Sequence, residues 1–164
     1  MEKVMWLVLG GTAFVCALRA HQSRRALSAA RWALGVLFLV FGAGVNLVYL
    51  LSDPDSYATF ADTSPFAFVR DTWDTLVAPH PVPYISLLIL GEAVAGLLLL
   101  AGGRWTRAGL IALIAFHVGQ LAFGGVLWVW APLMILTLGL LLRAERHWSA
   151  PVPGAPSRTV APAH

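Results

Sequence analysis

A single carboxyl group inside a long apolar stretch constrains this chain more than any other feature. The stretch runs from Tyr84 to Gly102, and Glu92, near its middle, is its one ionisable residue. At a rise of about 1.5 Å per residue, about 19 residues match a hydrocarbon layer of roughly 30 Å. An acid at that depth costs on the order of 2.5 to 3.5 kcal/mol on insertion scales. The stretch is therefore predicted to be a membrane-spanning helix whose acid faces other helices and not lipid.

The face of this helix that carries Glu92 indicates how closely a neighbour can pack. Projected at about 100° per residue, the residues that share this face with Glu92 are Ala95, Gly96, Leu99 and Gly103. Small side chains in a membrane helix let a second helix approach closely. We therefore expect Glu92 to point into a helical bundle.

The composition extends this prediction to the whole chain. Apolar residues make up 59% and charged residues 12% of the 164 residues, whereas soluble proteins contain about 25% charged residues. We therefore expect one bundle in the lipid bilayer and no soluble domain. The formal net charge of +3 does not indicate nucleic acid, because the Arg residues stand beside the predicted spans and form no stripe with interleaved aromatic residues.

Further apolar runs predict an all-α integral membrane protein, a four-helix transmembrane bundle with one additional N-terminal helix. The four spans are placed at about 32–51, 84–102, 108–124 and 127–142, and the N-terminal helix at 1–20. The tract at 108–142 is too long for one crossing, and Gly124 with Gly125 divides it by a tight turn. The first run could instead be a cleaved signal peptide. Cleavage would release several Arg residues to the outside, so a retained helix is favoured.

The long polar connection at 52–83 is predicted to lie outside the membrane. Thr63 and Ser64 before Pro65 are typical of a helix N-cap followed by a first-turn proline, and apolar residues then recur at helical spacing. This predicts a short amphipathic helix at 66–77 that either caps the bundle or roofs a cavity. The acidic residues of this loop lack the spacing of metal ligands, so no metal site is predicted.

The distribution of positive charge predicts the orientation of the chain. Nine of the 11 Lys and Arg residues fall on one side of the predicted spans, and only Lys3 and Arg70 fall on the other. Because basic residues are enriched in cytoplasmic loops, we expect the N-terminus outside and the C-terminus in the cytoplasm. The Pro- and Ala-rich segment at 149–164 is predicted to be a disordered cytoplasmic tail.

Three stretches of the chain carry a family resemblance. They are Arg31-Trp-Ala-Leu-Gly-Val-Leu-Phe-Leu-Val-Phe-Gly42, Gly91-Glu92-Ala-Val-Ala-Gly96-Leu-Leu-Leu-Leu-Ala-Gly102, and the turn from Arg104 to Arg107. Over residues 31–142 the chain resembles the DoxX-like family of small bacterial four-helix membrane proteins. Members are associated with membrane oxidoreductase complexes, including a subunit of a thiosulfate:quinone oxidoreductase. The resemblance implies a quinone as ligand and, as partner, an oxidoreductase subunit or a second copy of the chain.

Four polar side chains from three predicted spans lie at similar depths. Counted from the outer ends at about 1.5 Å per residue, Gln120 and Asn46 are roughly 6 and 7 Å deep, and His117 and Glu92 roughly 10 and 12 Å. We expect Asn46, Glu92, His117 and Gln120 to line one ligand-binding cavity. Glu92 and His117 are the candidate catalytic residues, because an acid and an imidazole in contact could exchange a proton. The same side chains could instead serve helix packing alone.

Two classes of function are consistent with these residues. The first is a membrane subunit of an oxidoreductase that binds a quinone or another lipophilic ligand. Cys16 is the only cysteine, so redox chemistry would need a bound cofactor or a partner. The second class is a non-catalytic membrane anchor, assembly or lipid-binding protein. A transporter is less well supported, and no nucleophile or phosphate-binding motif indicates a hydrolase.

Overall fold

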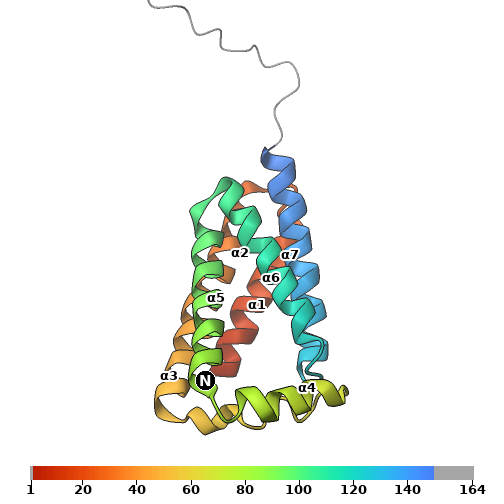
Figure 1. Cartoon of the computed structure of the whole chain (residues 1–164). Helices are drawn as coiled ribbons and strands as arrows, with labels where there is room; N and C mark the ends of the chain where they lie inside the picture. The colour runs from red at the N-terminus through yellow and green to blue at the C-terminus, as the bar shows by residue number, and fades with distance from the viewer. Residues whose placement is uncertain (1, 150–164) are drawn as a thin grey trace, which may run out of the picture.

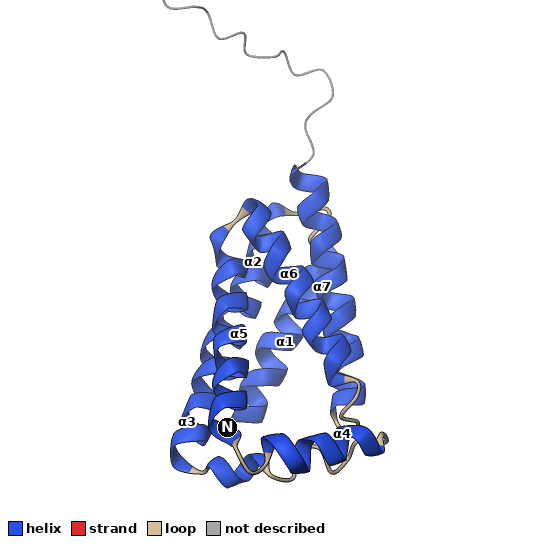
Figure 2. Ribbon diagram, viewed as in Figure 1, coloured by secondary structure: helices blue, strands red, loops and turns tan. Residues whose placement is uncertain are grey.

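The computed structural model describes residues 2–149, and within this range every regular element is a helix (Figure 2). The helices are α1 (Glu2–Arg19), α2 (Arg24–Val36), the π-helical η1 (Leu37–Gly44), α3 (Val45–Ser52), the 3-10 helix η2 (Pro54–Tyr57), α4 (Ala67–Thr72), the π-helical η3 (Trp73–Val77), α5 (Pro81–Ala101), α6 (Gly103–Gln120) and α7 (Leu127–Ser149). The prediction of an all-α chain is confirmed. The predicted disordered tail lies outside the described residues, apart from Ser149, which ends α7.

Three of the described helical stretches are long and apolar enough to cross a membrane. They are Arg24–Ser52, Pro81–Ala101 and Leu127–Ser149. The apolar part of α1, Val4–Arg19, is shorter. Helix α6 is not one of the three, because its 18 residues include two Arg residues, a His and a Gln. Length and composition therefore assign three candidate spans among residues 2–149.

The long helices run side by side, and one short segment lies across their end (Figure 1). Helix α6 packs against α5 and α7, and α1 packs against α2 and α7. We call residues 53–80 the roof segment, because α4 and η3 cross the end of the bundle at which α1 begins and α3 ends. The roof segment and the loop between α6 and α7 therefore close one end of the bundle.

Three helices begin earlier than the apolar pattern predicts, whereas α7 begins at Leu127 as predicted and extends further, to Ser149. The span predicted at 32–51 belongs to one continuous helical rod, α2, η1 and α3, that begins at Arg24 because the Ser23 hydroxyl accepts a hydrogen bond from the backbone N–H of Ala26 at 3.3 Å. The helix predicted at 108–124 runs instead from Gly103 to Gln120. Hydropathy identifies only the apolar part of a helix, so polar residues in its first turns are not assigned to the helix.

The predicted face of α5 is buried as expected, with one exception. Glu92, Ala95, Gly96 and Leu99 are all buried within the bundle. Gly103 instead begins α6, and its φ of 58° follows a φ of 89° at Gly102 in the turn between α5 and α6. The helical projection fails at this position because the helix has already ended.

The roof segment departs from the predicted cap. The helix begins at Ala67, after an extended Phe66, and not at Pro65. Ser64 accepts from the backbone N–H of Phe66 at 3.2 Å and donates to Ala122 O at 2.6 Å, and Thr63 donates to Phe123 O at 3.0 Å. These two residues fasten the roof segment to the loop after α6, and this tertiary role displaces the predicted cap.

Only part of the predicted apolar face of this helix is covered. Trp73 and Val77 pack against a small core cluster formed by Leu50, Tyr57 and Ile85. Phe66 and Leu76 remain exposed. The helix at 67–77 is thus anchored through its second half.

We predict that replacing Gly96 by Leu destabilises the protein. A Cβ atom on Gly96 would lie 3.1 Å from both Gly35 O and Leu39 N, which are backbone atoms of the neighbouring rod. Such overpacking typically costs about 1–3 kcal/mol. Gly91→Leu is the matched control, because a Cβ atom there meets nothing within 4 Å. Thermal unfolding in mild detergent should separate the two variants, and equal unfolding temperatures would contradict the close packing of α5 on α2.

Candidate functional site

A cavity of about 630 Å³ lies between the helices at the roof end of the bundle. Side chains of α1, η1, α3, α5, α6, α7 and the roof segment line it, and most of them are apolar or aromatic. Cavities of roughly 300–1,000 Å³ with apolar walls and a few converging polar groups are typical of small-molecule sites. This cavity is therefore the candidate functional site.

All four residues predicted as ligand-binding line this cavity. Asn46 comes from α3, Glu92 from α5, and His117 and Gln120 from α6. Residues 46 and 92 are far apart in the sequence, yet their side chains meet directly. The structure thus brings the predicted residues to one place, and their roles remain a proposal.

The carboxylate of Glu92 is held by α3 and η1. Asn46 Nδ2 donates a hydrogen bond to Glu92 Oε2 at 2.8 Å. Gly42 provides the room, because a Cβ atom on that residue would lie 3.0 Å from Glu92 Cδ and Oε1. Glu92 is only 6% exposed, so the hydrogen bond from Asn46 offsets part of the hydration that the acid loses on burial.

A chain of hydrogen bonds connects this acid to the roof segment. The Tyr57 hydroxyl donates to Asn46 Oδ1 at 2.9 Å and lies 3.1 Å from Asn46 O, and Trp73 Nε1 donates to Tyr57 O at 2.8 Å. The roof segment therefore orients the Asn46 amide, which in turn orients Glu92. Sequence reasoning missed Tyr57 and Trp73 as site residues. The available signal in the sequence was that each of these aromatic side chains carries a hydrogen-bonding group within a loop rich in Asp.

His117 is buried with a defined hydrogen bond. Its Nδ1 lies 2.7 Å from Leu113 O. A carbonyl oxygen can only accept, so Nδ1 carries the proton, and in the neutral ring Nε2 is then an acceptor. The rings of Phe38 and Phe116 lie edge-to-face against the imidazole, with centroids 5.7 and 5.4 Å away. These contacts fix the orientation of the ring at the cavity wall.

Gln120 completes the polar part of the wall. Its Oε1 is buried and has no hydrogen-bond partner among the described residues. Within that same range no hydrogen bond joins Glu92 to His117 or Gln120. Glu92 and His117 thus share no direct hydrogen bond, and proton exchange between them stays a hypothesis. Both side chains line the same cavity, where a bound polar group can contact either of them.

The chemistry available in the cavity is hydrogen bonding and proton exchange. No group of three or more His, Cys, Asp or Glu residues in the described part of the chain could hold a metal ion. Glu92, His117 and Tyr57 are the titratable side chains among the lining residues, and the Tyr57 hydroxyl already donates to Asn46. The arrangement can bind the polar head of an otherwise apolar molecule.

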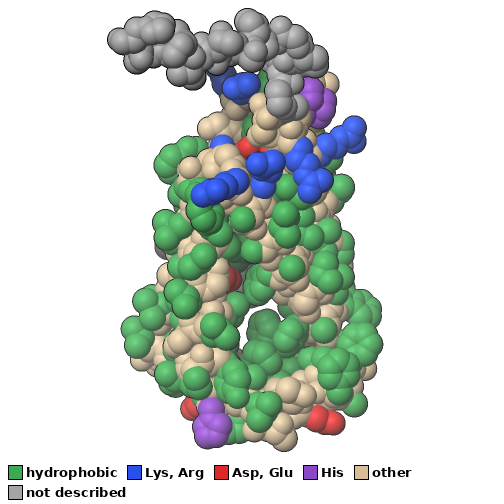
Figure 3. Space-filling view, turned by 45° about the horizontal axis from the view of Figure 1, so that its top comes forward, with side chains coloured by type: hydrophobic (Ala, Val, Ile, Leu, Met, Phe, Trp, Pro, Cys, Tyr) green, Lys and Arg blue, Asp and Glu red, His purple; other side chains and the backbone are tan. Residues whose placement is uncertain are grey.

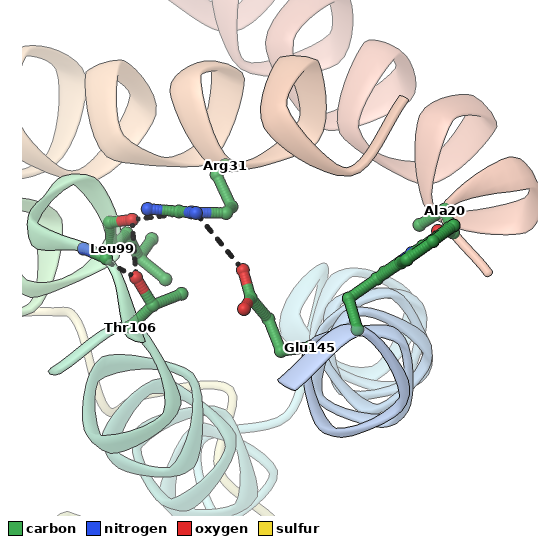
Figure 4. Close-up of polar contacts among 7 residues, drawn as sticks. Ala20, Arg31, Leu99, Thr106 and Glu145 are labelled. Carbon is green, nitrogen blue, oxygen red and sulfur yellow. Dashed lines mark hydrogen bonds and ion pairs between the residues drawn. The ribbon is translucent and has the colours of Figure 1, made fainter. Parts of the chain in front are cut away.

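A second buried polar cluster lies at the opposite end of the bundle (Figure 4). Arg31 Nη1 lies 3.2 Å from Glu145 Oε1, and Arg31 Nε donates to Leu99 O at 3.0 Å. Thr106 donates to the same carbonyl at 3.1 Å. Glu145 is 5% exposed. The cluster joins α2, α5, α6 and α7, and sequence reasoning missed it because Glu145 follows the last predicted span.

Aromatic side chains of α7 connect this end of the bundle to the turn that directly follows α1. Trp148 Nε1 donates to Ala20 O at 3.0 Å, and the Arg24 guanidinium lies 4.8 Å from the centre of the Trp148 ring. His21 stacks on His147 with ring centroids 4.1 Å apart. The end of the bundle away from the cavity is thus fastened across all of its long helices.

We predict that Arg31→Met and Glu145→Leu each destabilise the protein by roughly 3 kcal/mol, because each leaves a buried charge without its partner. The double variant should lose clearly less free energy of unfolding than the two single variants together, since it buries no unpaired charge. Chemical unfolding in detergent micelles measures this difference. Additive losses would show that the ion pair does not couple the two helices.

Comparison with known proteins finds no match to this chain. No protein-family model matches the chain, and neither a curated protein nor a solved structure matches it.

Proposed function

We propose that this chain is a multi-pass membrane protein that binds a lipophilic small molecule in the cavity, with the polar head of the molecule against Glu92. The observation that supports this proposal most strongly is the convergence of Glu92, His117 and Gln120 on one largely apolar cavity without a hydrogen bond among them. Polar groups that only join helices pair with one another. These groups leave hydrogen-bonding capacity for a third molecule.

The proposed arrangement in the membrane uses four spans and the N-terminal helix. The rod at 24–52 and helices α5, α6 and α7 form the four spans, and α1 completes the bundle. Lys and Arg side chains gather at the end away from the roof segment (Figure 3), while the five Asp residues of the roof segment are exposed. By the positive-inside rule, the roof segment and the N-terminus face the outside of a bacterial inner membrane, and the C-terminus faces the cytoplasm.

A quinone is one candidate ligand, on the basis of the DoxX-like resemblance. Its reduced quinol form fits the acceptors of Glu92 and His117, because its hydroxyl groups donate hydrogen bonds, and its tail would lie along the apolar wall. In this proposal the chain is a membrane subunit that acts with a partner oxidoreductase subunit, or as a homo-oligomer, because electrons must pass between the ligand and another protein. The alternative is a non-catalytic anchor, assembly or lipid-binding protein, in which the bond between Asn46 and Glu92 serves packing alone.

The orientation predicts the activity of reporter fusions. Alkaline phosphatase fused after Asp74 should be active, because the enzyme folds only outside the cytoplasm, and the fusion after Arg146 should be inactive. A cytoplasmic reporter at the same two positions is the control and should give the opposite pattern. Reversed activities would overturn the proposed orientation.

Ligand binding predicts that a lipophilic molecule co-purifies with the protein. Mass spectrometry of protein purified in mild detergent should detect it. Leu88→Trp should reduce its amount by about tenfold, because Leu88 lines the cavity and a larger side chain fills it. Leu90→Trp is the control, since Leu90 is exposed on the same helix and lines no part of the cavity. Equal amounts in both variants, or bulk phospholipid alone in the wild type, would contradict the proposal.

A further inference from the structure

The hydrogen-bonding capacity left at Glu92 and His117 is of one kind. The donors beside these two side chains are used within the protein, since Asn46 Nδ2 donates to Glu92, Tyr57 donates to Asn46, and His117 Nδ1 donates to Leu113 O. Glu92 Oε1 and His117 Nε2 take part in no hydrogen bond among the described residues. Both are acceptors, whereas the Gln120 amide offers its unpaired oxygen and also an NH₂ group.

A second feature is a groove that reaches the cavity from the side. A smaller hollow of about 340 Å³ lies between α5 and α6, and Leu87, Gly91 and Ala112 are among the residues that line it. It shares Leu88, Glu92 and Phe116 with the main cavity. Figure 3 shows a hollow on this face of the molecule. Leu87 is 68% exposed, so the groove opens at the side of the bundle that faces lipid in the proposed membrane arrangement.

The divergence of α5 and α6 explains why this groove exists. The two helices are joined by the turn at Gly102 and Gly103 and pack tightly near Gly109, where a Cβ atom would lie 2.9 Å from Leu98 Cβ. Toward the roof segment they move apart (Figure 1). Their separation opens the groove at the level of Glu92.

Aromatic rings cover part of the cavity on the side that faces water. Phe60 and Trp73 of the roof segment pack against each other and against Phe123 of the loop after α6, with ring centroids 5.2 to 5.4 Å apart. Thr63 and Ser64 fasten the roof segment to the same loop by hydrogen bonds. A ligand that entered between the roof segment and this loop would have to break these contacts.

Resting on the proposed function, we infer that the cavity takes a lipophile whose head donates hydrogen bonds, such as an alkylphenol or a long-chain alcohol. The molecule enters sideways from the bilayer between α5 and α6. Its hydroxyl lies among Glu92, His117 and Gln120, and its tail follows the groove back into lipid. A head that only accepts hydrogen bonds would face acceptors, and repulsion between lone pairs would weaken its binding.

The test compares two probes that differ in one hydrogen-bond donor. Radiolabelled 4-nonylphenol and its methyl ether are equilibrated with the protein in phospholipid nanodiscs, and empty nanodiscs of the same lipid correct for partition into the bilayer. The phenol should saturate at one molecule per chain and bind about tenfold more tightly than the ether. Equal affinities, or tighter binding of the ether, would overturn this inference and leave the proposed function standing. Saturation by neither probe would overturn both.

A variant of Glu92 tests directly whether the ligand head must donate a hydrogen bond. In Glu92→Gln the amide oxygen keeps the hydrogen bond from Asn46, so the NH₂ group takes the place of Oε1 and donates instead of accepting. The preference for the phenol should fall or reverse. Gln120→Leu is the matched control, because it removes an acceptor and the NH₂ donor of the same amide together and should weaken the binding of both probes alike. An unchanged preference in folded Glu92→Gln would overturn the assignment of the Glu92 acceptor.

The lateral route is tested by filling the groove. Gly91→Trp should slow association of 4-nonylphenol by about tenfold, because Gly91 lines the groove and has open space around it. Gly139→Trp on α7 is the matched control, since Gly139 has equally open space but lines neither hollow. Association at the wild-type rate in Gly91→Trp would exclude this route.

Discussion

The hydrogen bond between Asn46 and Glu92 is the interaction on which the arrangement of this bundle depends. An acid at the middle of an apolar helix needs a partner within the protein, and α3 supplies it only if α5 packs very closely on the rod of α2, η1 and α3. Gly96 makes this approach possible where it meets the backbone of that rod, and Gly42 leaves the space for the carboxylate. The position of Glu92 thus determines which helix faces meet and where the cavity forms.

Buried polar groups are arranged differently at the two ends of the bundle. At one end, Arg31 pairs with Glu145 and donates to a carbonyl that Thr106 also reaches, so four helices are joined without an intervening cavity. At the other end, the polar groups surround a cavity and keep acceptors free. Unused hydrogen-bonding capacity is costly in an apolar interior. Glu145 Oε1 also accepts no hydrogen bond, but the Arg31 guanidinium lies 3.2 Å away and offsets its charge, whereas Gln120 Oε1 beside the cavity has no such partner among the described residues, which favours a ligand there.

The polar residues that line the cavity follow from the sequence more directly than the contacts that surround them do. The depth and the face of Glu92 and His117 follow from the constant rise and rotation of a helix, so both could be placed without tertiary information. Tyr57 lies in irregular backbone, and Glu145 gains its partner only through the packing of α7 on α2. Ser64 is predicted as a local cap but binds a loop 58 residues away. Interactions of this kind depend on contacts that no local pattern encodes.

The π-helical segment η1 explains how one face of the rod can line the cavity over its length. Phe38, Gly42 and Asn46 are four residues apart, and Phe38 and Asn46 line the cavity while Gly42 contacts Glu92. In an α-helix, residues four apart drift around the axis by about 40° at each step, so this face would turn away from Glu92. A π-helix contains more residues per turn, and the segment from Leu37 to Gly44 offsets the drift. The wider turn is therefore what lets Asn46 reach the acid while Phe38 still packs on His117.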